Sequence, residues 1–309
     1  MSKRTSGNNI HGILLLDKRL GVSSNKALQE VRRLFNANKA GHTGSLDPLA
    51  TGLLPLCFGE ATKVSGMMLD DDKRYQVEIQ LGVMTDTGDA EGQVLETKPV
   101  PVISTAQLAA CLTHFTGEIA QVPPMYSALK HEGKKLYELA RAGITIERKA
   151  RHIRIFEIKQ LDFAPPFLTL EVACSKGTYI RSLAEDIGHY LGCGGTVTKL
   201  RRLQAGCFQL AAAFTLEQLT AMDNPTLQAS LLAVDTPLAA IPALYLTEAQ
   251  ATAIGYGQTI DSPPAPVGRV RLYHQLQFLG LGETLLNGKL CPRKLFNLPI
   301  AINNGLSNP

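Results

Sequence analysis

Two segments with alternating apolar residues place the strongest constraint on the fold. In residues 75–81 apolar side chains alternate with Gln and Glu, and in residues 168–174 they again occupy every second position. A period of two is typical of strands with one buried face. A helical pattern follows the second strand, and its apolar face consists of Ile180, Leu183, Ala184, Ile187 and Leu191. Strands joined by turns and interleaved with helices predict an α+β fold with antiparallel pairing, rather than a doubly wound parallel sheet.

The length of 309 residues suggests two domains. A strand is expected at residues 13–16, followed by a helix that begins at Ser24. Residues 212–243 contain acidic residues and prolines but no Lys or Arg, which is typical of a boundary region between domains. Beyond it we expect a helix near residues 248–254 and strands at 267–272 and 276–279. The sequence therefore predicts a larger unit over residues 10–243 and a small β-rich domain over residues 244–309.

Composition narrows the class of protein. The six cysteines form no CxxC pair and offer no zinc spacing, so we expect free thiols and no metal. No apolar run reaches the ~20 residues that a membrane span needs, which favours a soluble, cytoplasmic protein. The acidic connection at residues 85–92 does not match a calcium-loop spacing, and we interpret it as a solvated loop.

Basic residues are concentrated in one segment. Residues 124–154 carry eight Lys or Arg against three Glu, whereas the whole chain has a net charge of only +4. Such a cluster is typical of a contact with a nucleic-acid backbone, although an ordinary solvated surface gives the same composition. The segment opens with the pair Pro123 and Pro124, which fits a hinge. Met125 and Tyr126 lie close to the cations in sequence, and apolar and aromatic groups of this kind suit RNA.

Asp47 lies in a stretch, residues 40–59, that contains four glycines and two prolines but no other aspartate. Because Asp47 precedes Pro48, one interpretation is the N-cap of a helix. The other is a functional carboxylate, since Gly41 and Gly44 remove side chains from the loop and allow a large substrate to approach. The residues alone leave both interpretations open.

Arg181 is the natural partner for this carboxylate. It falls in the first turn of the helix after the second strand, where a cation opposes the helix dipole. A partly buried arginine requires a carboxylate partner, and its charge would lower the pKa of Asp47 and keep it ionised. A solvent-facing Arg181 is the alternative. Tyr75 and Tyr179 are either pocket residues or ordinary packing residues.

Three motifs taken together resemble the bacterial TruB family, the tRNA pseudouridine-55 synthases. They are residues 41–54 (GHTGSLDPLATGLL), 73–75 (KRY) and 176–188 (KGTYIRSLAEDIG), and the likeness extends from about residue 12 to about residue 298. The resemblance implies isomerisation of uridine to pseudouridine in the T arm of tRNA, with flipping of the target base and no cofactor. It implies a mixed, largely antiparallel central sheet and a C-terminal PUA-like RNA-binding domain. We expect a monomer whose partner is tRNA.

The resemblance also implies roles for individual residues. Asp47 matches the catalytic aspartate, Arg181 its ion-pair partner, and Tyr75 the tyrosine that stacks on the target base and helps to remove its C5 proton. The implied substrate-binding residues are His42, which fills the space left by flipped bases, together with Tyr179 and Leu200. Residues 124–152 fall where the family has an RNA-clamping insertion. The cations implied to contact RNA are Lys130, Lys134, Lys135, Arg141, Arg148, Lys149 and Arg151.

The sequence departs from the family pattern at Arg19, where proline is usual, which leaves the loop shape before Val22 open. Two other classes of function compete with a synthase. A non-catalytic tRNA-binding or tRNA-folding module would keep the basic segment, but it would not need Asp47, Arg181 and Tyr75 together. A phosphatase with an aspartate nucleophile would need a second carboxylate and a magnesium site. The loop around Asp47 provides no second carboxylate.

Overall fold

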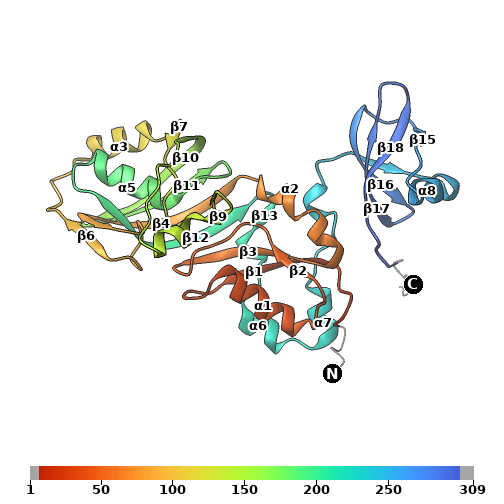
Figure 1. Cartoon of the computed structure of the whole chain (residues 1–309), viewed down its shortest axis with the longest axis horizontal. Coiled ribbons are helices and arrows are strands. Elements are labelled where there is room, and N and C mark those ends of the chain that lie inside the picture. Colours follow the sequence, from red (N-terminus) through yellow and green to blue (C-terminus); the bar gives the residue numbers. More distant parts are fainter. Residues whose placement is uncertain (1–6, 300–309) are drawn as a thin grey trace, which may run out of the picture.

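The computed structural model describes residues 7–299. Two separate sheets dominate it, one built by the first two thirds of the chain and one by the last third (Figure 1). The larger sheet has nine strands and the smaller has five.

The larger sheet is mixed but largely antiparallel, as predicted. Its main path runs in the order β1 (Gly12–Lys18), β3 (Ala50–Phe58), β12 (Gly195–Ala205), β4 (Lys73–Leu81), β11 (Phe167–Cys174), β10 (Arg151–Ala164) and β7 (Gly117–Gln121). Strand β2 (Ala40–His42) pairs with β3, and β13 (Phe208–Gln209) pairs with β12. Only the contact between β3 and β12 is parallel. The strand predicted at residues 75–81 is therefore β4, at the centre of the sheet.

The helices pack against the face of this sheet on which every second side chain is buried. Val77 and Ile79 on β4 and Leu170 on β11 belong to the same buried cluster as Leu183 and Ile187. The last two lie on α5 (Ile180–Tyr190), which has the apolar face expected from the sequence. The other helices of eight or more residues in this unit are α1 (Ser24–Leu34) and α3 (Thr105–His114), which contribute to the same cluster.

The smaller sheet forms the β-rich C-terminal domain. Its strands run in the order β14 (Ala243–Tyr245), β16 (Gly268–His274), β17 (Gln277–Thr284), β18 (Lys289–Leu295) and β15 (Ile260–Asp261). One helix, α8 (Glu248–Gly255), accompanies it. The helix and the two strands expected in this region are present, and β17 extends further than the pattern predicted.

The acidic segment 212–243 is not a free linker. It contains the short helices α6 (Leu216–Ala221) and α7 (Asn224–Ala229) and lies along β1. The Ile13 amide donates to the Leu232 carbonyl at 2.9 Å, and the Asp17 amide donates to the Phe214 carbonyl at 2.8 Å. Backbone pairing and the buried Leu219 and Leu227 attach this segment to the larger unit despite its linker-like composition.

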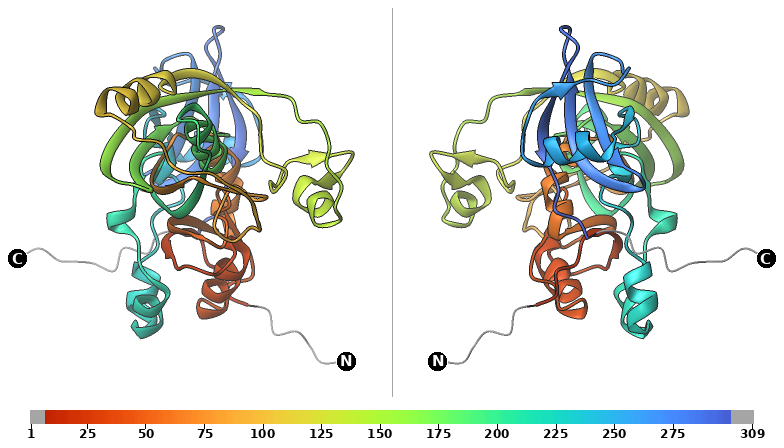
Figure 2. Two further views of the ribbon diagram at one scale, coloured as in Figure 1. Left: turned by 90° about the vertical axis from the view of Figure 1, so that its left-hand side faces the viewer. Right: turned by 90° about the vertical axis from the view of Figure 1, so that its right-hand side faces the viewer.

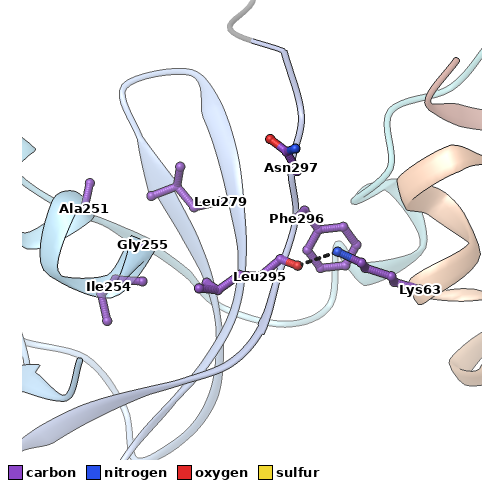
Figure 3. Close-up of a pocket in the computed structure, with 8 residues that line it drawn as sticks. All are labelled: Lys63, Ala251, Ile254, Gly255, Leu279, Leu295, Phe296 and Asn297. Atoms are coloured by element: carbon purple, nitrogen blue, oxygen red, sulfur yellow. Dashed lines mark hydrogen bonds between the residues drawn. The ribbon is translucent and has the colours of Figure 1, made fainter. Parts of the chain in front are cut away.

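The two sheets share a buried cluster. Tyr273, Phe278, Leu281 and Phe296 of the C-terminal domain belong to the same cluster as Ile13 and other residues of the larger unit. Beside it, the Lys63 ammonium donates to the Leu295 carbonyl at 2.8 Å and lies 5.3 Å from the centre of the Phe296 ring (Figure 3). These groups border a pocket of about 290 Å³, and none of the predicted site residues lines it.

Tyr273→Phe should weaken the junction between segment 212–243 and the C-terminal domain. The Tyr273 hydroxyl donates to the Asp235 carboxylate and accepts from Arg271 at 2.9 Å. Losing a hydrogen bond to a charged group should lower the free energy of unfolding by about 1.5–3 kcal/mol, measured by urea denaturation. Tyr245→Phe is the matched control, because Tyr245 stacks on Tyr273 but is 65% exposed. Equal stability of both variants would show that the hydroxyl contributes nothing.

Candidate active site

Asp47 lies in a tight loop between β2 and β3. No helix follows it, since β3 begins at Ala50, and the Ala50 amide donates to the Asp47 carbonyl at 3.0 Å. The N-cap interpretation is therefore wrong, because the chain after Pro48 turns directly into a strand. Gly44 has φ of +83°, a conformation that favours glycine, and this justifies one of the loop glycines.

Hydrogen bonds from α1 and from the turn after β1 fix the backbone of this loop. The Ser24 hydroxyl donates to the Leu46 carbonyl at 3.0 Å and accepts from the Leu46 amide at 2.7 Å. The Gly21 amide donates to the Pro48 carbonyl at 2.9 Å. These bonds fix the backbone on both sides of Asp47. Its side chain stays accessible, with 44% of its surface exposed.

The open question about Arg181 is answered by the geometry. Its Nη2 lies 2.9 Å from Asp47 Oδ2, and its side chain is only 7% exposed. It also donates to the carbonyls of Thr87 and Tyr126, each at 2.8 Å. The predicted pair of side chains is present, and Arg181 is held in place by two backbone acceptors in addition to Asp47.

Asp89 is a residue that the sequence reasoning missed. It is 4% exposed, and its Oδ2 lies 3.6 Å from Arg181 Nη1. Its other oxygen accepts from the Thr87 hydroxyl at 2.7 Å and from the Glu91 amide at 3.1 Å. The expectation of a solvated loop at residues 85–92 is thus wrong for its centre. The available signal was the position of this polar turn, close after the central strand β4 and the short β5 (Val83–Thr85).

The charge balance at Asp47 also differs from expectation. Burial raises the pKa of Asp47 above its ordinary value, Arg181 lowers it, and Asp89 raises it again. The net direction is upward, because Asp47 loses part of its hydration and shares its guanidinium with a second carboxylate. Arg181 therefore limits the rise in pKa rather than producing a net fall.

Tyr75 and Leu200 lie on adjacent central strands. Tyr75, near the start of β4, is half-buried, and burial raises the pKa of its phenol. Leu200 on β12 is 9% exposed and pairs with Val77 on one side and Ala50 on the other. The strand register therefore places Leu200 beside the start of β3, shortly after Asp47. The strand that carries Leu200, β12, also pairs with β4, the strand that carries Tyr75.

His42 and Lys18 complete the surroundings of the loop. His42 ends β2, and burial together with nearby Arg202 lowers its pKa, which favours the neutral ring. Its Nδ1 is buried without a hydrogen-bond partner among residues 7–299. Lys18 is 1% exposed and donates to the Val22 carbonyl at 2.7 Å; burial lowers its pKa to about 8. The loop shape left open at Arg19 is stabilised by a bidentate pair with Glu30, at 2.9 and 3.1 Å.

Tyr179 immediately precedes α5 and connects the site to the basic segment. Its amide donates to the Gln121 side chain at 2.8 Å, and the same side chain donates to the Tyr179 carbonyl at 3.1 Å. Gln121 ends β7, directly before the basic segment. Burial raises the pKa of the Tyr179 phenol.

The basic segment forms an arm that stands away from the sheet. It contains β8 (Lys130–His131), β9 (Lys134–Lys135) and α4 (Leu136–Arg141), and Figure 2 shows it in yellow-green, extended to one side of the molecule. Among the cations predicted to contact RNA, the exposed ones are Lys130, Lys134, Arg141, Lys149 and Arg151. Lys135 and Arg148 are half-buried, and Lys135 and Arg141 lie 5.3 and 5.4 Å from the Tyr137 ring.

Two further properties of the described residues concern metals and membranes. Over residues 7–299 no group of three or more His, Cys, Asp or Glu side chains is placed to hold a metal ion. In the same part of the chain, no helix is both long and apolar enough to cross a bilayer.

Comparison with known sequences gives matches along almost the whole chain. Residues 32–180 match the model of the TruB family pseudouridylate synthase N-terminal domain. Residues 181–239 match that of the tRNA pseudouridylate synthase B C-terminal domain, and residues 242–296 that of the pseudouridine synthase II TruB C-terminal domain.

Full-length relatives are about half identical in sequence. The tRNA pseudouridine synthase B of Actinobacillus pleuropneumoniae is 51% identical, over 96% of this chain and 99% of the relative. That of Chromohalobacter salexigens is 50% identical, over 96% and 98%. The fold is also similar to a solved H/ACA RNP bound to a substrate RNA containing 2'-deoxyuridine, with a TM-score of 0.70, 20% identity, and coverage of 93% of this chain and 86% of that chain.

Proposed function

The chain belongs to the TruB family of pseudouridylate synthases, and on that premise we propose that it isomerises uridine 55 in the T arm of tRNA to pseudouridine. The relatives named tRNA pseudouridine synthase B support the reaction and tRNA as its substrate. The choice of uridine 55, the aspartate nucleophile and base flipping extend the proposal beyond those names. We place the activity in the cytoplasm, with the enzyme acting as a monomer.

The observation that carries the proposal is the pair formed by Asp47 and Arg181. An exposed carboxylate on a rigid loop meets a buried guanidinium at 2.9 Å. The guanidinium holds the carboxylate in one orientation and favours its ionised form, and a nucleophile requires both. A helix cap would need neither a buried arginine nor a glycine-rich approach.

In the proposed reaction Asp47 acts as the nucleophile that allows the glycosidic bond to break. The detached base turns, its C5 atom bonds to the ribose carbon, and the bond that Asp47 had formed breaks, which regenerates the carboxylate. The C5 proton then leaves, and the phenolate form of Tyr75 receives it. Tyr75 lies on β4 beside β12, the strand that carries Leu200. Leu200 forms an apolar wall, Tyr179 another side of the pocket, and the neutral His42 occupies the space left by flipped bases.

The arm supplies RNA affinity in this proposal. Its cations lie on a projecting element, where they can follow a phosphate backbone without being buried in the protein. Lys130, Lys134 and Lys135 lie on or beside a two-stranded hairpin, and Arg148, Lys149 and Arg151 lie on the return to β10. Arg141 ends α4 between these two groups.

Two alternatives are disfavoured by specific contacts. A non-catalytic tRNA-folding module has no use for a buried arginine that orients an exposed carboxylate. A phosphatase gains some support from Asp89, the second carboxylate that the loop itself lacks. However, Asp47 and Asp89 share the cation Arg181, which occupies the place that a magnesium ion would need.

Asp47→Asn should abolish the conversion. The amide preserves the size of the side chain but is a poor nucleophile, so pseudouridine formation on a T-arm stem-loop should fall at least 1,000-fold. Binding of tRNA, measured by filter binding, should change less than threefold. Turnover within tenfold of the wild-type rate would reject Asp47 as the nucleophile.

Arg181→Lys should reduce the single-turnover rate by ~100-fold or more while tRNA affinity changes little. Lysine keeps the charge but cannot bond Asp47, Thr87 and Tyr126 at the same time, so the carboxylate rotates out of line. A displacement of ~1 Å can cost ~100-fold in rate. The measurement combines single-turnover kinetics with a binding titration. If affinity collapses and the rate of the bound complex stays normal, Arg181 is an RNA contact.

Replacing Lys134, Lys135, Arg148 and Lys149 with Ala should weaken tRNA binding and flatten its salt dependence. Each lost phosphate contact should reduce the slope of log affinity against log salt by about 0.7–0.9. Alanine substitution of the cations Lys289, Arg293 and Lys294 on β18 measures separately what the C-terminal sheet contributes to the slope. An unchanged slope in the arm variant would make the arm an ordinary solvated surface.

A further inference from the structure

A second buried arginine, Arg202, has no role in the reaction as described so far. Arg202 lies on strand β12 and is 1% exposed. Its Nε donates to the Leu53 carbonyl at 2.7 Å, and its Nη2 donates to the Gly44 carbonyl at 3.3 Å. Arg202 thus links β12 both to β3 and to the loop that presents Asp47.

Arg202 lacks the anionic partner that a buried arginine normally has. Over residues 7–299 no carboxylate forms an ion pair with it, whereas the neighbouring Arg201 pairs with Asp17 at 2.6 Å. Charged side chains are almost never fully buried unless they are paired. The positive charge of Arg202 is therefore available for a negative charge that arises nearby.

The residue opposite Arg202 on the neighbouring strand β4 is Tyr75, whose phenol is a weak acid. Tyr75 and Arg202 are direct partners in the antiparallel pairing of β4 and β12, so their side chains share one face of the sheet. A register shift lies immediately beyond Arg202, and such irregularities redirect side chains next to active sites. Burial raises the pKa of the Tyr75 phenol, and the nearby positive charge of Arg202 opposes that rise.

Other charged and titratable groups lie around this pair. Besides Arg202, two groups influence the pKa of Tyr75: Cys174 on β11 and Asp47 on its loop, both of which raise it. Arg202 also lies near three basic groups, Lys18, His42 and Lys73. Burial lowers the pKa of each, and the charge of Arg202 lowers it further. Asp47 is held by Arg181, and the Cys174 thiol is kept neutral because burial raises its pKa to about 12. Among these three acidic groups, only Tyr75 lies directly opposite Arg202 in the strand pairing.

We propose that Arg202 is a positioning residue for removal of the C5 proton, orienting the Tyr75 oxygen and balancing the charge of its phenolate. A guanidinium has five donors and no acceptor, so any hydrogen bond between the two groups must be accepted by the Tyr75 oxygen. The remaining lone pairs, or the hydroxyl proton, then face the pocket. Arg202 itself touches no reacting atom. This inference rests on the proposed function.

The step balances without a cofactor. The Tyr75 phenol first releases its proton to solvent. After the new bond to the ribose carbon has formed, the phenolate oxygen takes the proton from C5. The electron pair of the C5–H bond forms the C5–C6 double bond, and the pair of the N1–C6 double bond moves to N1, which takes a proton from solvent. Arg202 stabilises the phenolate before the transfer.

A double-mutant cycle tests whether Arg202 acts through Tyr75. Single-turnover rates on a T-arm stem-loop are measured for Arg202→Met, Tyr75→Phe and the double variant. We expect Arg202→Met to lose at least 30-fold in the wild-type background but less than threefold in the Tyr75→Phe background. Arg201→Met is the matched control and should lose less than threefold in both. Non-additivity below tenfold for Arg202 would overturn the proposal.

An isotope effect separates proton transfer from loss of structure. With deuterium at C5 of the target uridine, Arg202→Met should show a larger primary isotope effect than the wild type, because C5 deprotonation becomes slower. Binding of tRNA should stay within threefold. A slower variant with an unchanged isotope effect would mean that Arg202 supports only the loop, through its bond to Gly44.

If Arg202→Met does not fold, nitrogen spectra of the arginine side chains test the contact in chains that keep Arg202. Tyr75→Phe should shift the Arg202 guanidinium signals and leave those of Arg201 unchanged. No shift at Arg202 would overturn the proposal. If the wild-type protein makes no pseudouridine, the proposed function fails, and these spectra still report on the contact separately.

Discussion

The site depends on one buried guanidinium that is shared by two carboxylates. Arg181 lies at the start of α5, Asp47 on the loop before β3, and Asp89 on the turn beyond β4. These segments are far apart in sequence and meet around the central strand β12, which pairs with β3, is bridged by Asp89 and packs against α5. The arginine neutralises two anions that would otherwise repel one another, and it gives each of them a fixed direction.

The sharing also explains why the two carboxylates can have different roles. Asp89 is buried and accepts hydrogen bonds from its own turn, so its oxygens are occupied. Asp47 has a partly exposed side chain, and its ion-pair partner is Arg181. One carboxylate therefore serves the structure of the site, and the other remains accessible to a substrate. The pKa of Asp47 is raised because the side chain is partly buried and because Asp89 is a second anion nearby.

Local patterns predicted the elements well, and long-range contacts less so. The alternation in β4 and β11 identified central strands because burial of one face imposes a period of two, and the apolar stripe of α5 was equally clear. The turn at residues 85–92 was misinterpreted because its polar groups bond to one another, which composition cannot distinguish from solvation. Asp47 with Pro48 resembled a helix start, but the pairing of Ala50 with β12 determined the outcome. Arg202 opposite Tyr75 depends on strand register, which no local pattern specifies.

The base of the arm is clamped, and this determines where the arm can bend. Gln121 bonds both backbone groups of Tyr179, Ser182 donates to the Val122 carbonyl at 3.2 Å, and Arg181 donates to the Tyr126 carbonyl. All three anchors lie at the start of α5, on either side of the prolines at 123 and 124. The double proline thus lies in the fixed base of the arm and does not form its hinge. The Tyr126 carbonyl and the Asp47 carboxylate share one guanidinium, so a single side chain fixes both the base of the arm and the candidate nucleophile.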